Sequence, residues 1–126
     1  GLNMYDGRLK DRRRYKRLPI KLHLEVDEVF KQDNVVLKGM GASITVVDIS
    51  KSGIGFISDA NLPVGYYFGG TLDLGDNDMF HVVIQIVRAT IMEKTGQICY
   101  GAEFVGLAPF LAEKVDRYEK RLQKIL

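Results

Sequence analysis

The chain has 126 residues, of which 46% are apolar, and a formal net charge of +2. These values suit one compact domain with an ordinary core, and the single cysteine, Cys99, excludes an internal disulfide and a CxxC redox or zinc site. No apolar stretch approaches the roughly 18 residues of a membrane span, and no signal-peptide pattern opens the chain. We therefore expect a cytoplasmic domain without membrane insertion.

Positive charge is concentrated near the N-terminus. Between positions 8 and 17, seven basic residues oppose only Asp11, for a net charge of +6, whereas the rest of the chain carries −4. Repulsion between neighbouring cations disfavours compact local structure. We expect residues 1–18 to form a flexible basic arm with an anionic partner and residues 19–126 to form the folded domain.

The folded part begins with an alternating pattern that predicts a half-buried strand. The apolar positions are Ile20, Leu22, Leu24 and Val26, and polar residues stand between them. A second strand is predicted over Val35–Val47, with a kink or bulge at Gly39–Gly41, and a third over Gly53–Ser58.

Three further strands follow at short intervals. They are predicted over Tyr66–Leu74, Met79–Glu93 and Gln97–Val105, with a turn at Gly75–Asp78 between the first two and a turn at Lys94–Gly96 between the last two. Six short strands in one small domain favour an all-β fold, an antiparallel sheet closed into a six-stranded β-barrel, because closure removes exposed edges.

The apolar period changes only after Pro109. Leu111, Val115, Tyr118, Leu122 and Ile125 recur at helical spacing, which predicts an amphipathic C-terminal helix. Its apolar stripe would either cap the barrel or pair with a second copy in a homodimer. Two heptads are too few for a coiled coil, so we favour capping.

Two segments carry candidate binding chemistry. Arg13 and Arg17 stand four residues apart, so their guanidinium groups can converge on a guanine edge or a phosphate. The segment Asp48–Gly53 adds a carboxylate that suits the N1–H and N2–H donors of guanine. It also adds the Ser50 hydroxyl, which suits a phosphate, and Gly53 permits a tight turn or a close backbone approach. Alone, the first segment is also typical of solvated basic arms and the second of an ordinary turn.

Together the two segments resemble the PilZ family, whose signature is RxxxR followed by [D/N]xSxxG. Here they read Arg13-Arg14-Tyr15-Lys16-Arg17 and Asp48-Ile49-Ser50-Lys51-Ser52-Gly53, with Gly55-Phe56 and Gly101-Ala102-Glu103-Phe104 also in the family's manner. The resemblance covers nearly the whole chain, in the right order.

This resemblance implies a PilZ-like split barrel that binds the bacterial second messenger cyclic di-GMP. Arg13 and Arg17 would hold guanine and phosphate, Asp48 and Ser50 would contact the guanine edge and a phosphate, and Gly53 would allow close approach. Arg12 is similar to residues in family members that take up two stacked ligand molecules. The arm would become ordered on binding and signal to an unidentified downstream protein, in motility or exopolysaccharide regulation.

Other functions find less support in the residues. His23 and His81 are far apart, and no metal-ligand spacing or nucleophile motif appears, so we expect no enzyme, metal or cofactor. We interpret the acidic residues at 73, 76 and 78 as a turn rather than a calcium loop, and the aromatic run Tyr66–Phe68 as packing rather than a stacking platform. Two alternatives stay open: a barrel that binds single-stranded nucleic acid, and a ligand-independent PilZ-like interaction module.

Overall fold

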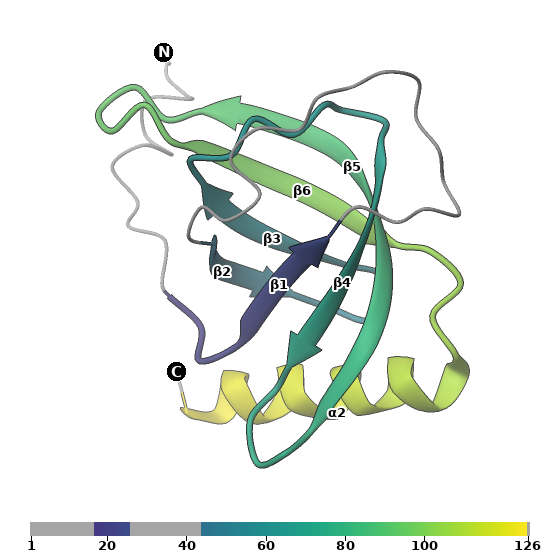
Figure 1. Cartoon of the computed structure of the whole chain (residues 1–126). Helices are drawn as coiled ribbons and strands as arrows, with labels where there is room; N and C mark the ends of the chain where they lie inside the picture. The colour runs from purple at the N-terminus through teal and green to yellow at the C-terminus, as the bar shows by residue number, and fades with distance from the viewer. Residues whose placement is uncertain (1–16, 26–43, 126) are drawn as a thin grey trace.

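A computed structural model describes residues 17–25 and 44–125. In chain order, its elements are β1 (Lys21–Glu25), β2 (Ile44–Ile49), β3 (Gly53–Ser58), β4 (Tyr67–Asp73), β5 (Met79–Ile91), β6 (Ile98–Phe104) and α2 (Pro109–Ile125), as Figure 1 shows. The predicted all-β fold with a C-terminal helix is confirmed.

All six strands belong to one antiparallel sheet with the order β1-β4-β5-β6-β3-β2. The sheet curls until its two outer strands, β1 and β2, come close together (Figure 1). Leu18, just before β1, donates its backbone N–H to the carbonyl oxygen of Val46 in β2 at 2.9 Å. The sheet is therefore a nearly closed barrel, which leaves little unpaired strand edge.

The predicted strands agree with the structure to within a few residues. The third predicted strand has the same bounds as β3, and β4 and β6 are each one residue shorter at both ends than the fourth and sixth predicted strands. The fifth ends at Ile91 because residues 93–95 already form the turn. Only the end of the predicted Val35–Val47 strand is described, and β2 continues past it to Ile49. The bulge expected at Gly39–Gly41 lies outside the described residues.

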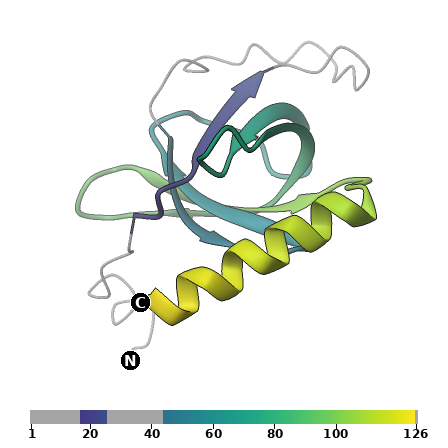
Figure 2. The ribbon, with the colours of Figure 1, turned by 90° about the horizontal axis from the view of Figure 1, so that it is seen from below.

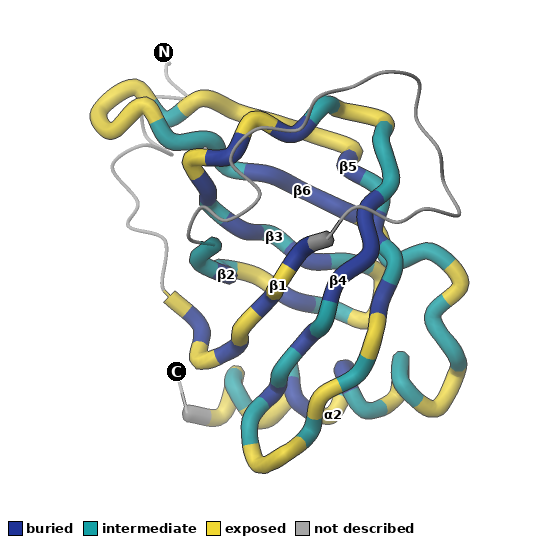
Figure 3. Tube along the Cα trace, viewed as in Figure 1, coloured by how far each residue is buried: buried dark blue, intermediate teal, exposed yellow. Residues whose placement is uncertain are grey.

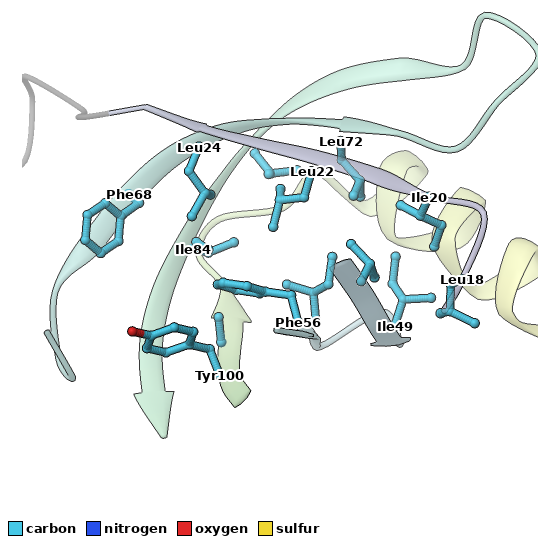
Figure 4. Close-up of a cluster of buried hydrophobic side chains, with 14 of the residues drawn as sticks. Leu18, Ile20, Leu22, Leu24, Ile49, Phe56, Phe68, Leu72, Ile84 and Tyr100 are labelled. Carbon is cyan, nitrogen blue, oxygen red and sulfur yellow. The ribbon is translucent and has the colours of Figure 1, made fainter. Parts of the chain in front are cut away.

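Buried and more exposed residues alternate along the strands, and the buried side chains form the core inside the barrel (Figure 3). Inward-facing aliphatic and aromatic side chains of all six strands meet there, together with side chains from the segment just before β1, and Figure 4 labels ten residues of this core. The rings of Phe56 and Tyr100 lie 5.3 Å apart between centroids. The Tyr100 hydroxyl donates to the carbonyl oxygen of Ala60 at 2.5 Å and accepts from the backbone N–H of Leu62 at 2.8 Å. This buried side chain therefore fixes the segment that leads from β3 to β4.

Helix α2 lies against one end of the barrel (Figures 1 and 2). Val115 and Tyr118 from its apolar stripe belong to the core cluster, and Leu122 packs against that cluster. At the edge of this stripe the helix is tied to the β4–β5 turn, because Lys114 Nζ lies 2.7 Å from Asp78 Oδ1. The helix therefore caps the barrel, as predicted. No helix in the described part of the chain has the length and apolar character to cross a membrane.

Candidate ligand-binding site

A bulge in β2 decides which way Asp48 faces. Val46 pairs with Phe56, and the next paired residue is Asp48, opposite Gly55, so Val47 is an extra residue in the strand. In a regular strand, Asp48 would face the same way as buried Val46, because side chains alternate between the two faces. The bulge instead turns Asp48 to the outer face of the barrel, where it is exposed, while Ile49 returns to the core.

The turn between β2 and β3 is held by two backbone hydrogen bonds. The N–H of Ser50 donates to the carbonyl oxygen of Gly53 at 2.9 Å, and the N–H of Gly53 donates back to Ser50 at 3.3 Å. The Ser50 hydroxyl lies 2.9 Å from that of Ser52, whose carbonyl oxygen accepts from the N–H of Phe104 at 3.0 Å. The turn is thus fixed to the end of β6, and the Ser50 hydroxyl sits beside the exposed end of β2.

Gly53 is required by the packing of two neighbouring strands. A Cβ at this position would overlap the carbonyl oxygen of Ala102 in β6 and lie 3.2 Å from its carbonyl carbon. The backbone that approaches Gly53 is that of β6, and the close approach of a ligand at this position stays a prediction.

The arginine motif is only partly described. Arg12 and Arg13 lie outside the described residues, as does the predicted arm up to residue 16. Arg17 is exposed, and the residue after it, Leu18, is buried and bonded to Val46. Since Val46 is two residues before Asp48, this bond fixes the last arginine of RxxxR beside the strand that carries the carboxylate.

The outer face next to Asp48 also carries residues that the motifs do not contain. Gly55 lies opposite Asp48, Gly101 lies opposite Gly55, and Arg88 lies opposite Gly101. Arg88 does not stand out in the sequence, because its position in the same row as Asp48 depends on strand order and on a second bulge.

The residues set aside at the sequence level fit structural roles. His23 is exposed on β1, as predicted from its polar side of the strand. Asp73 Oδ1 accepts the N–H of Gly75 at 2.8 Å in the β4–β5 turn, and no cluster of three metal-binding side chains occurs among the described residues. Phe68 is fully buried and Tyr66 packs against the core, which confirms the packing interpretation for both.

Comparisons with known proteins place this geometry in a family. No curated protein matches the sequence. The solved PilZ domain with c-di-GMP of YcgR from Escherichia coli is similar in structure, with a TM-score of 0.54 and 21% sequence identity over 90% of this chain and 92% of that chain. A family model described as the PilZ domain matches residues 11–120, from the arginine motif into α2. The chain therefore belongs to the PilZ domain family.

Proposed function

We propose that this PilZ domain is a non-catalytic receptor for cyclic di-GMP. Its ligand site would consist of five residues of the two motifs and of the arginine just before the first motif: Arg13, Arg17, Asp48, Ser50 and Gly53, with Arg12. The observation that carries the proposal is the outward position of Asp48 beside the segment that begins at Arg17. The similar structure of the YcgR domain, which was solved with c-di-GMP, supports it.

The chemistry of each group suits one part of the ligand. Asp48 is exposed, and no hydrogen bond from another described residue to its carboxylate is found, so both oxygens can accept the N1–H and N2–H groups of a guanine. Arg13 and Arg17 supply forked donors for phosphate or for guanine O6 and N7. Ser50 contributes a hydroxyl near a phosphate, and Arg12 would stack on the guanine of a second ligand molecule.

Ligand binding would act as a switch by ordering the arm. The arm carries a charge of +6 between positions 8 and 17, and two phosphates would relieve the repulsion among its cations. The docked arm would then create or hide a surface for a downstream protein. Replacement of both Arg13 and Arg17 by Ala should abolish ligand-induced protection of the arm in amide exchange. Unchanged protection would contradict this switch.

Isothermal titration calorimetry with cyclic di-GMP tests the receptor function, with GMP as the comparison ligand and Arg13→Ala and Asp48→Ala as variants. We expect saturable binding by the unmodified protein that both variants lose. A stoichiometry of two ligands per chain would support the role of Arg12.

Absence of heat, together with no rise in Tm on addition of cyclic di-GMP, would contradict the proposal. The interaction module and the nucleic-acid alternative would then be separated by titration with single-stranded oligonucleotides. Only the second predicts binding that weakens steeply as salt is raised.

A further inference from the structure

Strand β5 contains a second bulge that has the same effect as the bulge in β2. Ile86 faces the core and pairs with Ala102, and the next paired residue is Arg88, opposite Gly101. Val87 is thus the extra residue. Without it Arg88 would point inward like Ile86, but the bulge turns Arg88 to the outer face, where it is exposed.

The two bulges place opposite charges at the two ends of one row across four strands. From β2 to β5 the row reads Asp48, Gly55, Gly101 and Arg88. Its ends are three strand spacings apart, about 14 Å. The two positions between the charges have no side chain, and we call Gly55 and Gly101 the glycine floor.

The guanidinium group of Arg88 lies over one half of the glycine floor. A Cβ on Gly101 would be 2.5 Å from Nη2 and 2.8 Å from Cζ of Arg88. Above Gly55, the nearest atom to such a Cβ is the Cβ of Asp48, at 3.2 Å. The surface over Gly55 therefore has the Asp48 side chain on one side and, over the neighbouring Gly101, the guanidinium of Arg88 on the other. Among the described residues, these two groups form no ion pair with each other.

We propose that Arg88 is a ligand-binding residue that holds the O6 and N7 edge of a guanine lying over Gly55, while Asp48 holds the N1 and N2 edge of the same base. The inference rests on the proposed cyclic di-GMP function and adds a specificity-determining residue outside both motifs. A guanidinium fork donates two hydrogen bonds to O6 and N7. Adenine presents an N6 donor in place of O6, so the combination of Asp48 and Arg88 selects guanine.

The test compares Arg88→Ala with Lys94→Ala in titrations with cyclic di-GMP. Lys94 is an exposed cation in the β5–β6 turn, so both variants lose one positive charge. We expect Arg88→Ala to weaken binding about 10- to 100-fold, the range of a lost bidentate base contact. Lys94→Ala should change binding less than about twofold, as expected for a distant exposed charge. Equal affinities of the two variants would overturn the role of Arg88.

A 7-deaza analogue of cyclic di-GMP, in which carbon replaces N7, shows whether Arg88 contacts the base. The loss of affinity caused by Arg88→Ala should be several-fold smaller for this analogue than for cyclic di-GMP, because one of the two hydrogen bonds from Arg88 is already absent. An equal loss with both ligands would assign Arg88 to a phosphate and overturn the guanine contact.

A second variant displaces the guanidinium group without removing its charge. In Gly101→Ala the new methyl group meets the end of the flexible Arg88 side chain rather than backbone, so the barrel should retain its Tm within about 2 °C. Binding should weaken in the same direction as in Arg88→Ala, and unchanged affinity would contradict the proposal. If the unmodified protein itself does not bind cyclic di-GMP, the proposed function fails. If it binds and neither Arg88→Ala nor Gly101→Ala changes the affinity, only the role of Arg88 fails and the receptor function stands.

Discussion

Replacement of Gly53 by Ala should destabilise the barrel far more than the same replacement at Gly55, two residues away on β3. At Gly53 the new methyl group would overlap the carbonyl oxygen of Ala102 and lie 3.3 Å from the Cα of Glu103. These are backbone atoms that no rotamer change can move, so β3 must separate from β6. Overpacking of this kind costs about 1–3 kcal/mol, and weakening the Ser50–Gly53 hydrogen bonds adds about 1 kcal/mol.

The expected total, about 2–4 kcal/mol, corresponds to a fall in Tm of roughly 8–16 °C for a domain of this size. Thermal unfolding followed by circular dichroism measures it. At Gly55 the methyl group would meet a side-chain atom, the Cβ of Asp48, at 3.2 Å, which can shift by a few tenths of an ångström. Gly55→Ala should therefore change stability by less than about 1 kcal/mol. A Gly53→Ala variant that melts within about 2 °C of the unmodified protein, or no higher stability for Gly55→Ala, would refute the reasoning.

Three further predictions concern contacts that hold the barrel together. Tyr100→Phe removes both hydrogen bonds of the buried hydroxyl and leaves the carbonyl oxygen of Ala60 and the N–H of Leu62 unpaired. The free energy of unfolding, measured in urea, should fall by about 2–4 kcal/mol. A fall of less than about 0.5 kcal/mol would contradict this role. Burial raises the pKa of Tyr100 above the ordinary tyrosine value of about 10. The stability that the neutral hydroxyl contributes is therefore complete below pH 10 and is lost as the pH rises further, because the unfolded chain ionises first. The free energy of unfolding should fall more steeply above pH 10 in the unmodified protein than in Tyr100→Phe, and parallel curves would contradict the pKa direction. Lys114→Ala breaks the half-exposed 2.7 Å ion pair with Asp78 and should lower the free energy of unfolding by only about 0.5–1 kcal/mol. Amide exchange in the β4–β5 turn should become faster, and this difference from the unmodified protein should disappear in high salt. Unchanged exchange would show that the pair does not hold the turn.

Much of the fold follows from local patterns in the sequence. Ile20, Leu22 and Leu24 point inward because the period of a strand is two, and Val115 and Tyr118 meet the core because the period of a helix is 3.6. Glycine-containing turns mark the ends of most strands. These features depend on neighbouring residues, so they could be predicted without knowledge of which strands pair.

Strand order and register depend on contacts between distant residues, and the sequence does not reveal them directly. The bulge in β2 lies at Val47, next to the candidate carboxylate. No glycine marks it, since a bulge depends on how the strand fits its partner, here β3. The same holds for the bulge at Val87 in β5.

The sequence by itself therefore determined the class of the fold, the capping helix and the two motifs, because each is set by spacing within a short segment. Only the tertiary structure decided which charged groups share a surface. Asp48 and Arg88 are 40 positions apart in the chain, yet strand order and two bulges place them in one row across a floor of glycines. Such a row forms only when β2, β3, β6 and β5 pair in that order, so its chemistry depends on register.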